Sequence, residues 1–200
     1  MLYTKLQNAF ARHELTEEEQ EICFNAFSSR TLERKEVLLR EGSLCRHLVF
    51  VDQGCLRAYA VGRNGVRQSI QFAIEGWVIT DLLSFLTEEP SVHGIDAVED
   101  SEVLLMDKAG RDRVLIQVPK FEHILRPLME ASFIAGQRRL NGLTELTLEE
   151  RYKTLARQYP ELIRRVPQMM LAQYLGVAPE TLSRATKQMG TKCEGDTVSP

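Results

Sequence analysis

The chain has 200 residues, of which 44% are apolar and 26% are charged, as in a soluble protein with one large domain or a medium domain and a small partner. No apolar run approaches the roughly 18–20 residues that a membrane-spanning helix needs, and the first 20 residues lack the basic and apolar regions of a secretion signal. We therefore expect a cytoplasmic protein that makes no membrane contact.

Cysteines and histidines, the usual metal ligands, are dispersed along the chain and form no ligand motif. The cysteines stand at positions 23, 45, 55 and 193, and the histidines at 13, 47, 93 and 123. Isolated cysteines are more often small core residues than ligands. The sequence therefore predicts neither a metal site nor an enzyme.

The first 30 residues are expected to be helical. Thr16 and Glu19 have the spacing of a capping box, in which each residue caps the backbone of the other at a helix N-terminus. Ile22, Phe24 and Phe27 follow as apolar positions. This helical segment is expected to pack on the domain that comes next.

Residues 31–110 predict a β domain. The stretches HLVFV, CLRAYAV and VRQSIQFA are rich in branched and aromatic residues and partly alternate with polar ones. Glycines recur 11 or 12 residues apart, at positions 42, 54, 65 and 76, and RNGV at 63–66 is a strong hairpin signal. Short strands between regularly spaced glycine turns are typical of a sandwich or small barrel such as a jelly roll.

From residue 111 onward the periodicity is helical. Pro119 and Pro127 each suit a first helical turn or a break, and a long helix is predicted after Pro127. Residues at alternating four- and three-residue steps form a heptad seam of largely small or polar side chains: Leu128, Ser132, Ala135, Arg139, Gly142 and Leu146. Small side chains let two helices approach closely, which favours a symmetric dimer. The alternative is a helix face that lies on the chain's own β domain.

A second capping box, Thr147 to Glu150, opens a helix that has Tyr152 and Leu155 on one face and ends before Pro160. Residues 191–200 show no periodicity and are expected to form a flexible tail. The predicted class is α+β, with N-terminal helices and an antiparallel β-roll in domain 1–118. A dimerisation helix (119–146), a small all-α domain (147–190) and the tail (191–200) follow.

The stretch VPQMMLAQYLGVAPETLSRATKQMG, residues 166–190, has the pattern of a helix-turn-helix. Gly176 is placed to end the first helix in a left-handed conformation, and Pro179 to begin the second. With Gln168 as the first position, the sites where two crossing helices bury side chains are all apolar: Leu171, Ala172, Leu175, Val177, Leu182 and Ala185. A helical hairpin without a DNA role would share only two or three of these features.

The outward face of the second helix carries side chains suited to reading a DNA groove. These are Glu180, Thr181, Arg184 and Lys187, and Ser183 and Gln168 complete the predicted DNA-binding set. Residues 162–193 hold five basic side chains and one acidic one, a local charge of +4 that leaves −7 for the rest of the net −3. A basic end on an acidic body is expected where that end meets phosphate, and a solvated basic helix face is the alternative.

The order of β-roll, long helix and helix-turn-helix resembles the Crp/Fnr family of bacterial transcription regulators over residues 37–189. LLREGSLCRHLVFVDQGCLRAY is similar to the family's opening strands, AVEDSEVLLMDK to its closing strands and PETLSRATK to its recognition helix. Glu180 and Arg184 fall on base-reading positions, Pro179 replaces a residue often basic in the family, and no β-wing follows, as in a wingless branch. The resemblance implies a homodimer that binds a two-fold-related site in double-stranded DNA, with RNA polymerase as a further partner.

The resemblance also implies an effector pocket in the β-roll, formed here by Trp77, Thr80, Asp81, Leu82, Phe85, Ser91 and His93. Cyclic-nucleotide-binding members hold the ribose with a Gly-Glu pair and the phosphate with an arginine. This chain has Thr80-Asp81 and Ser91 instead, and no Lys or Arg occurs between Arg67 and Lys108. A buried cyclic phosphate would lack a cationic partner, so cyclic AMP is not expected.

The expected effector is therefore an unknown, less anionic molecule, with Trp77 and Phe85 either beside it or in the core. The clustered cysteines of an iron–sulfur member and a distinct haem ligand are both lacking in the sequence. Two other functions stay open. One is a sensory module that signals through a protein partner, and the other is a cupin-like metal enzyme using His47 and His93.

Overall fold

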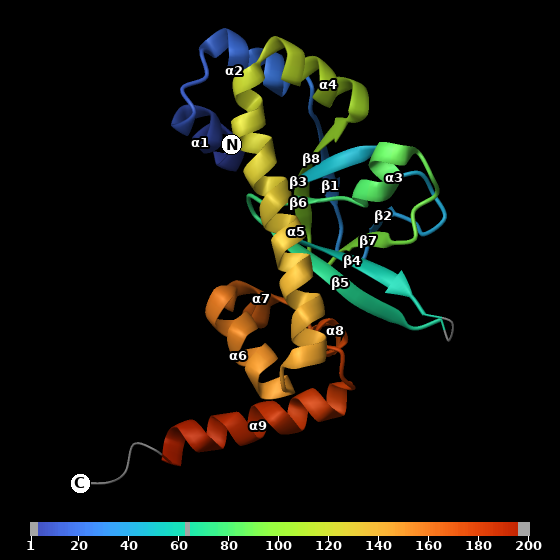
Figure 1. Ribbon diagram of the computed structural model, residues 1–200, viewed down its shortest axis with the longest axis vertical. Helices are drawn as coiled ribbons and strands as arrows, with labels where there is room; N and C mark the ends of the chain where they lie inside the picture. The colour runs from blue at the N-terminus through green and yellow to red at the C-terminus, as the bar shows by residue number, and fades with distance from the viewer. Residues whose placement is uncertain (1–3, 63–64, 196–200) are drawn as a thin grey trace, which may run out of the picture.

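The computed structural model describes residues 4–62 and 65–195 (Figure 1). The N-terminal helices and the β-roll form its upper part, one long helix runs down its length, and a small helical domain lies below (Figure 1). This is the predicted α+β class with the predicted order of parts. In the part of the chain that the structure describes, no helix is long and apolar enough to cross a membrane.

The N-terminal segment forms two helices, α1 (Thr4–Arg12) and α2 (Glu17–Phe24). The capping box is confirmed, because the Glu19 backbone N–H donates to Thr16 Oγ1 at 3.2 Å and the Thr16 N–H donates to Glu19 Oε2 at 2.8 Å. Phe10 of α1 is fully buried and packs against Phe24 at 5.0 Å between ring centroids. Both helices thus cover one end of the core.

Two four-stranded antiparallel sheets form the β-roll, in the orders β1-β8-β3-β6 and β2-β7-β4-β5. The strands are β1 (Ser28–Leu32), β2 (Val37–Leu39), β3 (His47–Gln53), β4 (Cys55–Val61), β5 (Arg67–Ile74), β6 (Val78–Ile79), β7 (Gly94–Ala97) and β8 (Ser101–Asp107). Strands β4 and β5 pair across the predicted hairpin turn, of which residues 63 and 64 lie outside the described residues. The apolar side chains between the sheets are almost fully buried, Leu56, Ile79 and Met106 among them.

The helices that follow the sheets lead to the long helix. Helix α3 (Leu82–Thr87) lies between β6 and β7, and α4 (Lys108–Gln117) and a 3-10 turn at Pro119–Phe121 precede α5 (Glu122–Glu145). The long helix therefore begins before Pro127 and not after it. Pro127 is the sixth residue of α5, so its missing N–H removes only one early hydrogen bond of the helix.

The lower domain consists of α6 (Leu148–Gln158), α7 (Pro160–Arg165), α8 (Gln168–Leu175) and α9 (Pro179–Gly195). The second capping box is confirmed, with Glu150 N–H donating to Thr147 Oγ1 at 3.3 Å. Helix α7 was not predicted. Helix α9 continues to Gly195, past the expected start of the tail at residue 191, and residues 196–200 lie outside the described residues.

Candidate nucleic-acid interface and effector pocket

The turn between α8 and α9 has the geometry that a helix-turn-helix requires. Gly176 has φ +73° and ψ +31°, and its N–H donates to the carbonyls of Ala172 and Gln173. A Cβ at this position would stand 2.7 Å from Leu143 Cδ2, the end of a half-buried side chain that would have to shift, so glycine is favoured mainly by the backbone conformation. The N–H of Val177 also donates to Ala172 O at 3.0 Å, which closes the turn.

The side chains predicted to hold the two helices together are buried. Ala172 is completely enclosed, and Leu171, Leu175 and Leu182 expose 1–4% of their surface. Val177 and Ala185 are half-buried. All of these except Ala185 form a second core with Leu155 of α6, Leu162 of α7 and Val166 just after α7. Packing in this core fixes the orientation of α9.

The outer face of α9 points away from that core. Glu180, Thr181, Arg184 and Lys187 are exposed, and Ser183 is half-buried. Gln168 is exposed at the start of α8. Among the described residues no ion pair engages Glu180 or Arg184, so their charged groups face solvent. Helix α9 lies across the lower end of the molecule, below the rest of the chain (Figure 1).

Part of the basic charge of this region does not face outward. The Arg165 guanidinium on α7 donates to Glu75 Oε1 and Oε2 at 2.8 Å each and to Glu99 at 3.0 Å, both acids belonging to the β-roll. Arg164 forms an ion pair with Glu161 on its own helix. Two of the five basic residues counted in this segment are therefore neutralised within the molecule.

The pKa of Glu75 reports the strength of the Arg165 contact. Burial acts to raise the pKa of this carboxyl, but hydrogen bonds from Arg165 and from the Gly54 N–H outweigh it and hold the pKa at about 2. The same carboxylates raise the pKa of Arg165. Glu75 is thus an ionised contact between the two domains.

Further contacts join the helix-turn-helix to the β-roll. Gln173 on α8 accepts from Ser69 Oγ at 3.1 Å, and Arg139 on α5 donates to both the Tyr174 and Ser69 carbonyls at 2.9 and 3.0 Å. Trp77 packs edge-on against Tyr159 at 5.0 Å. Trp77 also packs on the core of the β-roll, so its ring lies between that core and Tyr159 of the helical domain. The local sequence patterns gave no sign of these contacts.

The seam predicted for α5 faces the chain's own domains. Ser132 accepts a hydrogen bond of 2.8 Å from Gln71 on β5, Arg139 is bonded as described, and Gly142 is buried. Leu128 packs on the core of the β-roll, Ala135 is half-buried, and Leu146 is 40% exposed. These contacts fit the alternative interpretation of the heptad pattern, a helix face that lies on the chain's own β domain. The small and polar residues of this face allow close contact within the chain.

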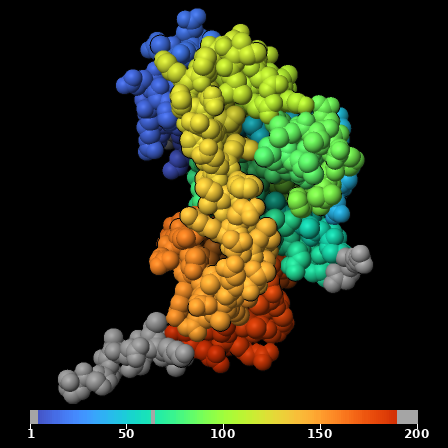
Figure 2. All heavy atoms as spheres, viewed as in Figure 1, coloured from blue at the N-terminus to red at the C-terminus, as the bar shows by residue number. Residues whose placement is uncertain are grey.

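A different stripe of α5 is apolar and uncovered. Phe133 is 67% exposed, Leu140 is 54% exposed and Ile134 is 45% exposed. Phe133 and Leu140 are seven residues apart and so lie on one side of the helix. The long helix runs along the visible face of the molecule (Figure 2).

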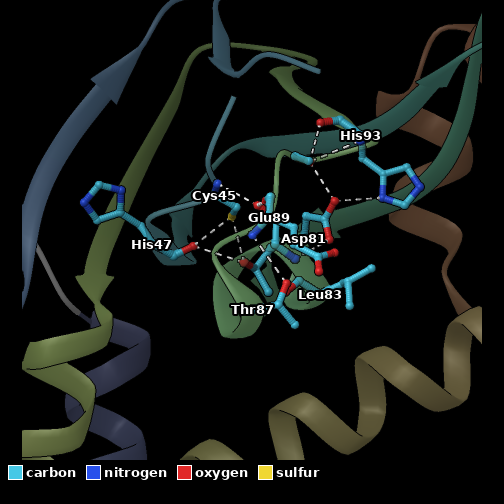
Figure 3. A network of polar contacts seen from close by, with 10 residues as sticks. Cys45, His47, Asp81, Leu83, Thr87, Glu89 and His93 are labelled. Atoms are coloured by element: carbon cyan, nitrogen blue, oxygen red, sulfur yellow. Dashed lines mark hydrogen bonds and ion pairs between the residues drawn. The ribbon is translucent and has the colours of Figure 1, made fainter. Parts of the chain in front are cut away.

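The predicted pocket residues around α3 form a closed polar network (Figure 3). Asp81 accepts from the Ser84 N–H that it caps, from Ser91 Oγ at 2.6 Å, and contacts His93 Nδ1 at 3.3 Å. Thr80 donates to the His47 carbonyl at 3.1 Å. The Asp81 carboxylate is therefore already satisfied by protein groups.

Two of the remaining pocket residues have other positions. Phe85 is a core residue with 2% exposure, and the Arg111 guanidinium lies over its ring at 5.2 Å. Leu82 is 42% exposed on the surface. Of the predicted pocket, the structure thus brings Asp81 together with Ser91 and His93, whereas Thr80 contacts the segment of Cys45 and His47.

The β-roll arginines on β4 and β5 are also engaged. Arg57 and Asp96 form a buried bidentate pair at 2.9 and 2.5 Å, and Arg67 adds a third contact to Asp96 at 3.2 Å. Arg57 also donates to Gln173 at 3.5 Å. A cyclic phosphate at Ser91 would lie against the Asp81 carboxylate. The guanidinium groups of Arg57 and Arg67 already form ion pairs with Asp96.

Metal-binding groups do not cluster in the part of the chain that is described. No three His, Cys, Asp or Glu side chains there converge as a metal site. His47 and His93 are on separate segments, and His93 is held by Asp81. Cys23, Cys45 and Cys55 are buried free thiols.

Residues 29–117 match the family model of the cyclic nucleotide-binding domain. The chain is 27% identical over 149 residues to the transcriptional regulatory protein btr of Bordetella pertussis, a match that covers 68% of this chain and 60% of that protein. The chain thus spans about three fifths of this relative's length.

Solved structures share the architecture. FixK2 from Bradyrhizobium japonicum has a TM-score of 0.67 at 20% identity, over 83% of this chain and 85% of that one. TTHA1359, a Crp/Fnr-family transcriptional regulator from Thermus thermophilus, has a TM-score of 0.65 at 16% identity, over 82% and 87%. The fold is that of the Crp/Fnr-type transcription regulators. Residues 29–117 form its cyclic-nucleotide-binding-like domain.

Proposed function

We propose that this protein binds double-stranded DNA and regulates transcription, with α9 as the helix that enters the major groove. The observation that carries the proposal is the exposed row Glu180, Thr181, Arg184 and Lys187 on a helix whose other side is fixed in a buried core. Arginine pairs bidentately with guanine and glutamate accepts from cytosine, so Arg184 and Glu180 supply base recognition. Thr181, Ser183, Lys187 and Gln168 supply further backbone or base contacts.

The protein acts as a homodimer in this proposal. The helix face with Phe133, Ile134 and Leu140 supplies the contact, because a second copy of α5 would cover its exposed apolar area. A two-fold axis along α5 places the two α9 helices about one turn of DNA apart, so the operator is palindromic. Contact with RNA polymerase stays a prediction.

The β-roll controls the geometry of the recognition helices. Arg165, Gln173 and Tyr159 tie the helix-turn-helix domain to the β-roll, so a ligand that shifts the strands also shifts α9. The engaged state of Asp81, Arg57 and Arg67 favours an effector other than a cyclic nucleotide.

The experiment is capture of genomic fragments by the purified protein at two salt concentrations, in the presence and absence of cell extract. Wild type and Arg157→Ala, which removes an exposed arginine from α6, are expected to enrich one palindromic site. Arg184→Ala is expected to lose about 1–3 kcal/mol of site affinity and to relax specificity at one position. Equal enrichment by Arg184→Ala would refute its role, and the lack of any enriched site under all conditions would refute the DNA-binding function.

A further inference from the structure

A cleft separates α1 from the first turns of α5, on a part of the β-roll that the proposed DNA-binding function does not use. Its volume is about 250 Å³, several times the roughly 30 Å³ that one water molecule occupies in the liquid. It shares no lining residue with the segment around Asp81 and Ser91. Helix α1 lies beside the upper part of α5 (Figure 1).

The floor of this cleft is apolar and comes from three sources. Strand β3 contributes Phe50 and Val51, strand β8 contributes Leu104, and α5 contributes Ile124 and Leu128. Four of these five side chains are buried, so their packing is fixed by the core and the floor is pre-formed. A floor of this kind accepts an aliphatic chain or an aromatic ring.

The rim of the cleft is basic. Lys5, Arg12 and His13 line it from α1, and His123 lines it from α5. All four are exposed, and among the described residues none of these side chains forms a hydrogen bond or an ion pair. The His13 and His123 rings lie nearly parallel, with centroids 6.5 Å apart. The one acidic residue in the lining, Asp52, already has an interaction partner.

We propose that this cleft binds a small monocarboxylate with an apolar body. The apolar part would lie on the floor formed by Phe50, Leu104 and Leu128, and the carboxylate would pair with Arg12 and the other cations of the rim. Burial of the apolar body supplies affinity, and the charge-assisted hydrogen bonds select an anion over a neutral or cationic molecule of the same shape. Because α5 forms one wall, occupancy is coupled to the helix that carries the proposed dimer contact.

The probe is n-octanoate, with octan-1-ol and n-octylammonium as molecules of similar shape and different charge. Binding to the full chain is followed by titration calorimetry and by the fluorescence of Trp77, the only tryptophan, which neighbours Gly76 in the cleft lining. Octanoate is expected to saturate one site per chain and to bind at least about tenfold more tightly than octanol, with octylammonium weaker still.

Two variants locate the site. Arg12→Glu is expected to weaken octanoate binding at least about tenfold, and Ala9→Phe is expected to abolish it by filling the cleft. Arg113→Glu, a charge reversal at an exposed position of α4 outside the lining, is expected to bind as wild type does. Circular dichroism and the melting temperature establish that each variant is folded.

Three results would overturn the assignment. One is the absence of saturable octanoate binding up to 10 mM by both readouts, and another is equal affinity for octanoate and octylammonium. The third is unchanged octanoate affinity in a folded Arg12→Glu variant.

Discussion

Arg165 on α7 and Glu75 after β5 form a two-point ion pair, with both guanidinium-to-carboxylate distances at 2.8 Å. Their side chains are 22% and 25% exposed, so the pair is largely shielded from water. Because α7 leads directly into the helix-turn-helix, this pair is a polar connection between that domain and the β-roll.

The pair makes stability depend on pH in a defined window. The pKa of Glu75 is about 2 in the folded protein, below its ordinary value of 4.5, so the unfolded chain binds the proton more readily. The stabilisation is therefore fully present above about pH 4.5 and is lost as the pH falls toward 2. The free energy of unfolding can be measured with urea at pH 7 and at pH 3.5. From pH 7 to pH 3.5, Glu75→Gln should lose about 1 kcal/mol less of it than wild type does.

Glu130→Gln, at an exposed position on α5, serves as the control and should behave as wild type does. Identical pH dependence in wild type and Glu75→Gln would show that the ion pair does not contribute to folding.

The turn between α8 and α9 favours glycine for its backbone conformation, and an added methyl group would also displace the Leu143 side chain. Gly176→Ala places a methyl group 2.7 Å from Leu143 Cδ2 at a residue with positive φ, and we expect it to cost about 2–3 kcal/mol of unfolding free energy. Gly65→Ala has a positive φ but no atom within 4 Å of the added carbon, so we expect about 1 kcal/mol. Chemical denaturation measures both, and equal losses would contradict the proposed steric contribution.

The exposed apolar stripe on α5 predicts the oligomeric state. Phe133→Glu combined with Leu140→Glu should convert a dimer to a monomer in sedimentation velocity and reduce site affinity at least about 100-fold, because one helix-turn-helix then binds alone. The control is Ile116→Glu, which changes an apolar residue on α4 that is 80% exposed. This variant should remain a dimer. A dimer that persists in the double variant would place the interface elsewhere.

Cyclic AMP is predicted not to be the effector. Asp81 is satisfied by Ser91 and the Ser84 N–H, so the segment that would hold the ribose and phosphate presents a closed, anionic group. Calorimetry with cyclic AMP up to 1 mM should show no saturable heat. A one-to-one isotherm in the micromolar range would contradict this, and would require the network in Figure 3 to open.

The features that could be predicted from the sequence are those encoded within a few residues. The capping boxes at Thr16 and Thr147 and the glycine at 176 follow from patterns spanning a single turn, and all three have the expected conformation. The strands also follow from their local composition. The second helix of the helix-turn-helix, α9, was found by the same kind of pattern.

Features that depend on distant partners could not be predicted. The Arg165 contacts join residues 66 and 90 positions apart, so the basic segment was counted as if all of it faced DNA. The heptad on α5 showed that one face packs closely, but a periodic pattern does not specify whether the partner is another copy or the chain's own β5 and α8. The contact of Trp77 with Tyr159 was not predicted for the same reason, because the two residues are remote in sequence.

The most direct test is a dimethyl sulfate footprint on the captured site, which reports access to guanine N7 in the major groove, with wild type and Arg184→Ala compared at equal occupancy. Two protected regions about 10 base pairs apart, each centred on one major groove and two-fold related, are the predicted result. Loss of protection at one defined base pair of each half-site in Arg184→Ala would assign that contact to α9. A single protected region, or protection that is unchanged by Arg184→Ala, would contradict a dimer that reads DNA with this helix.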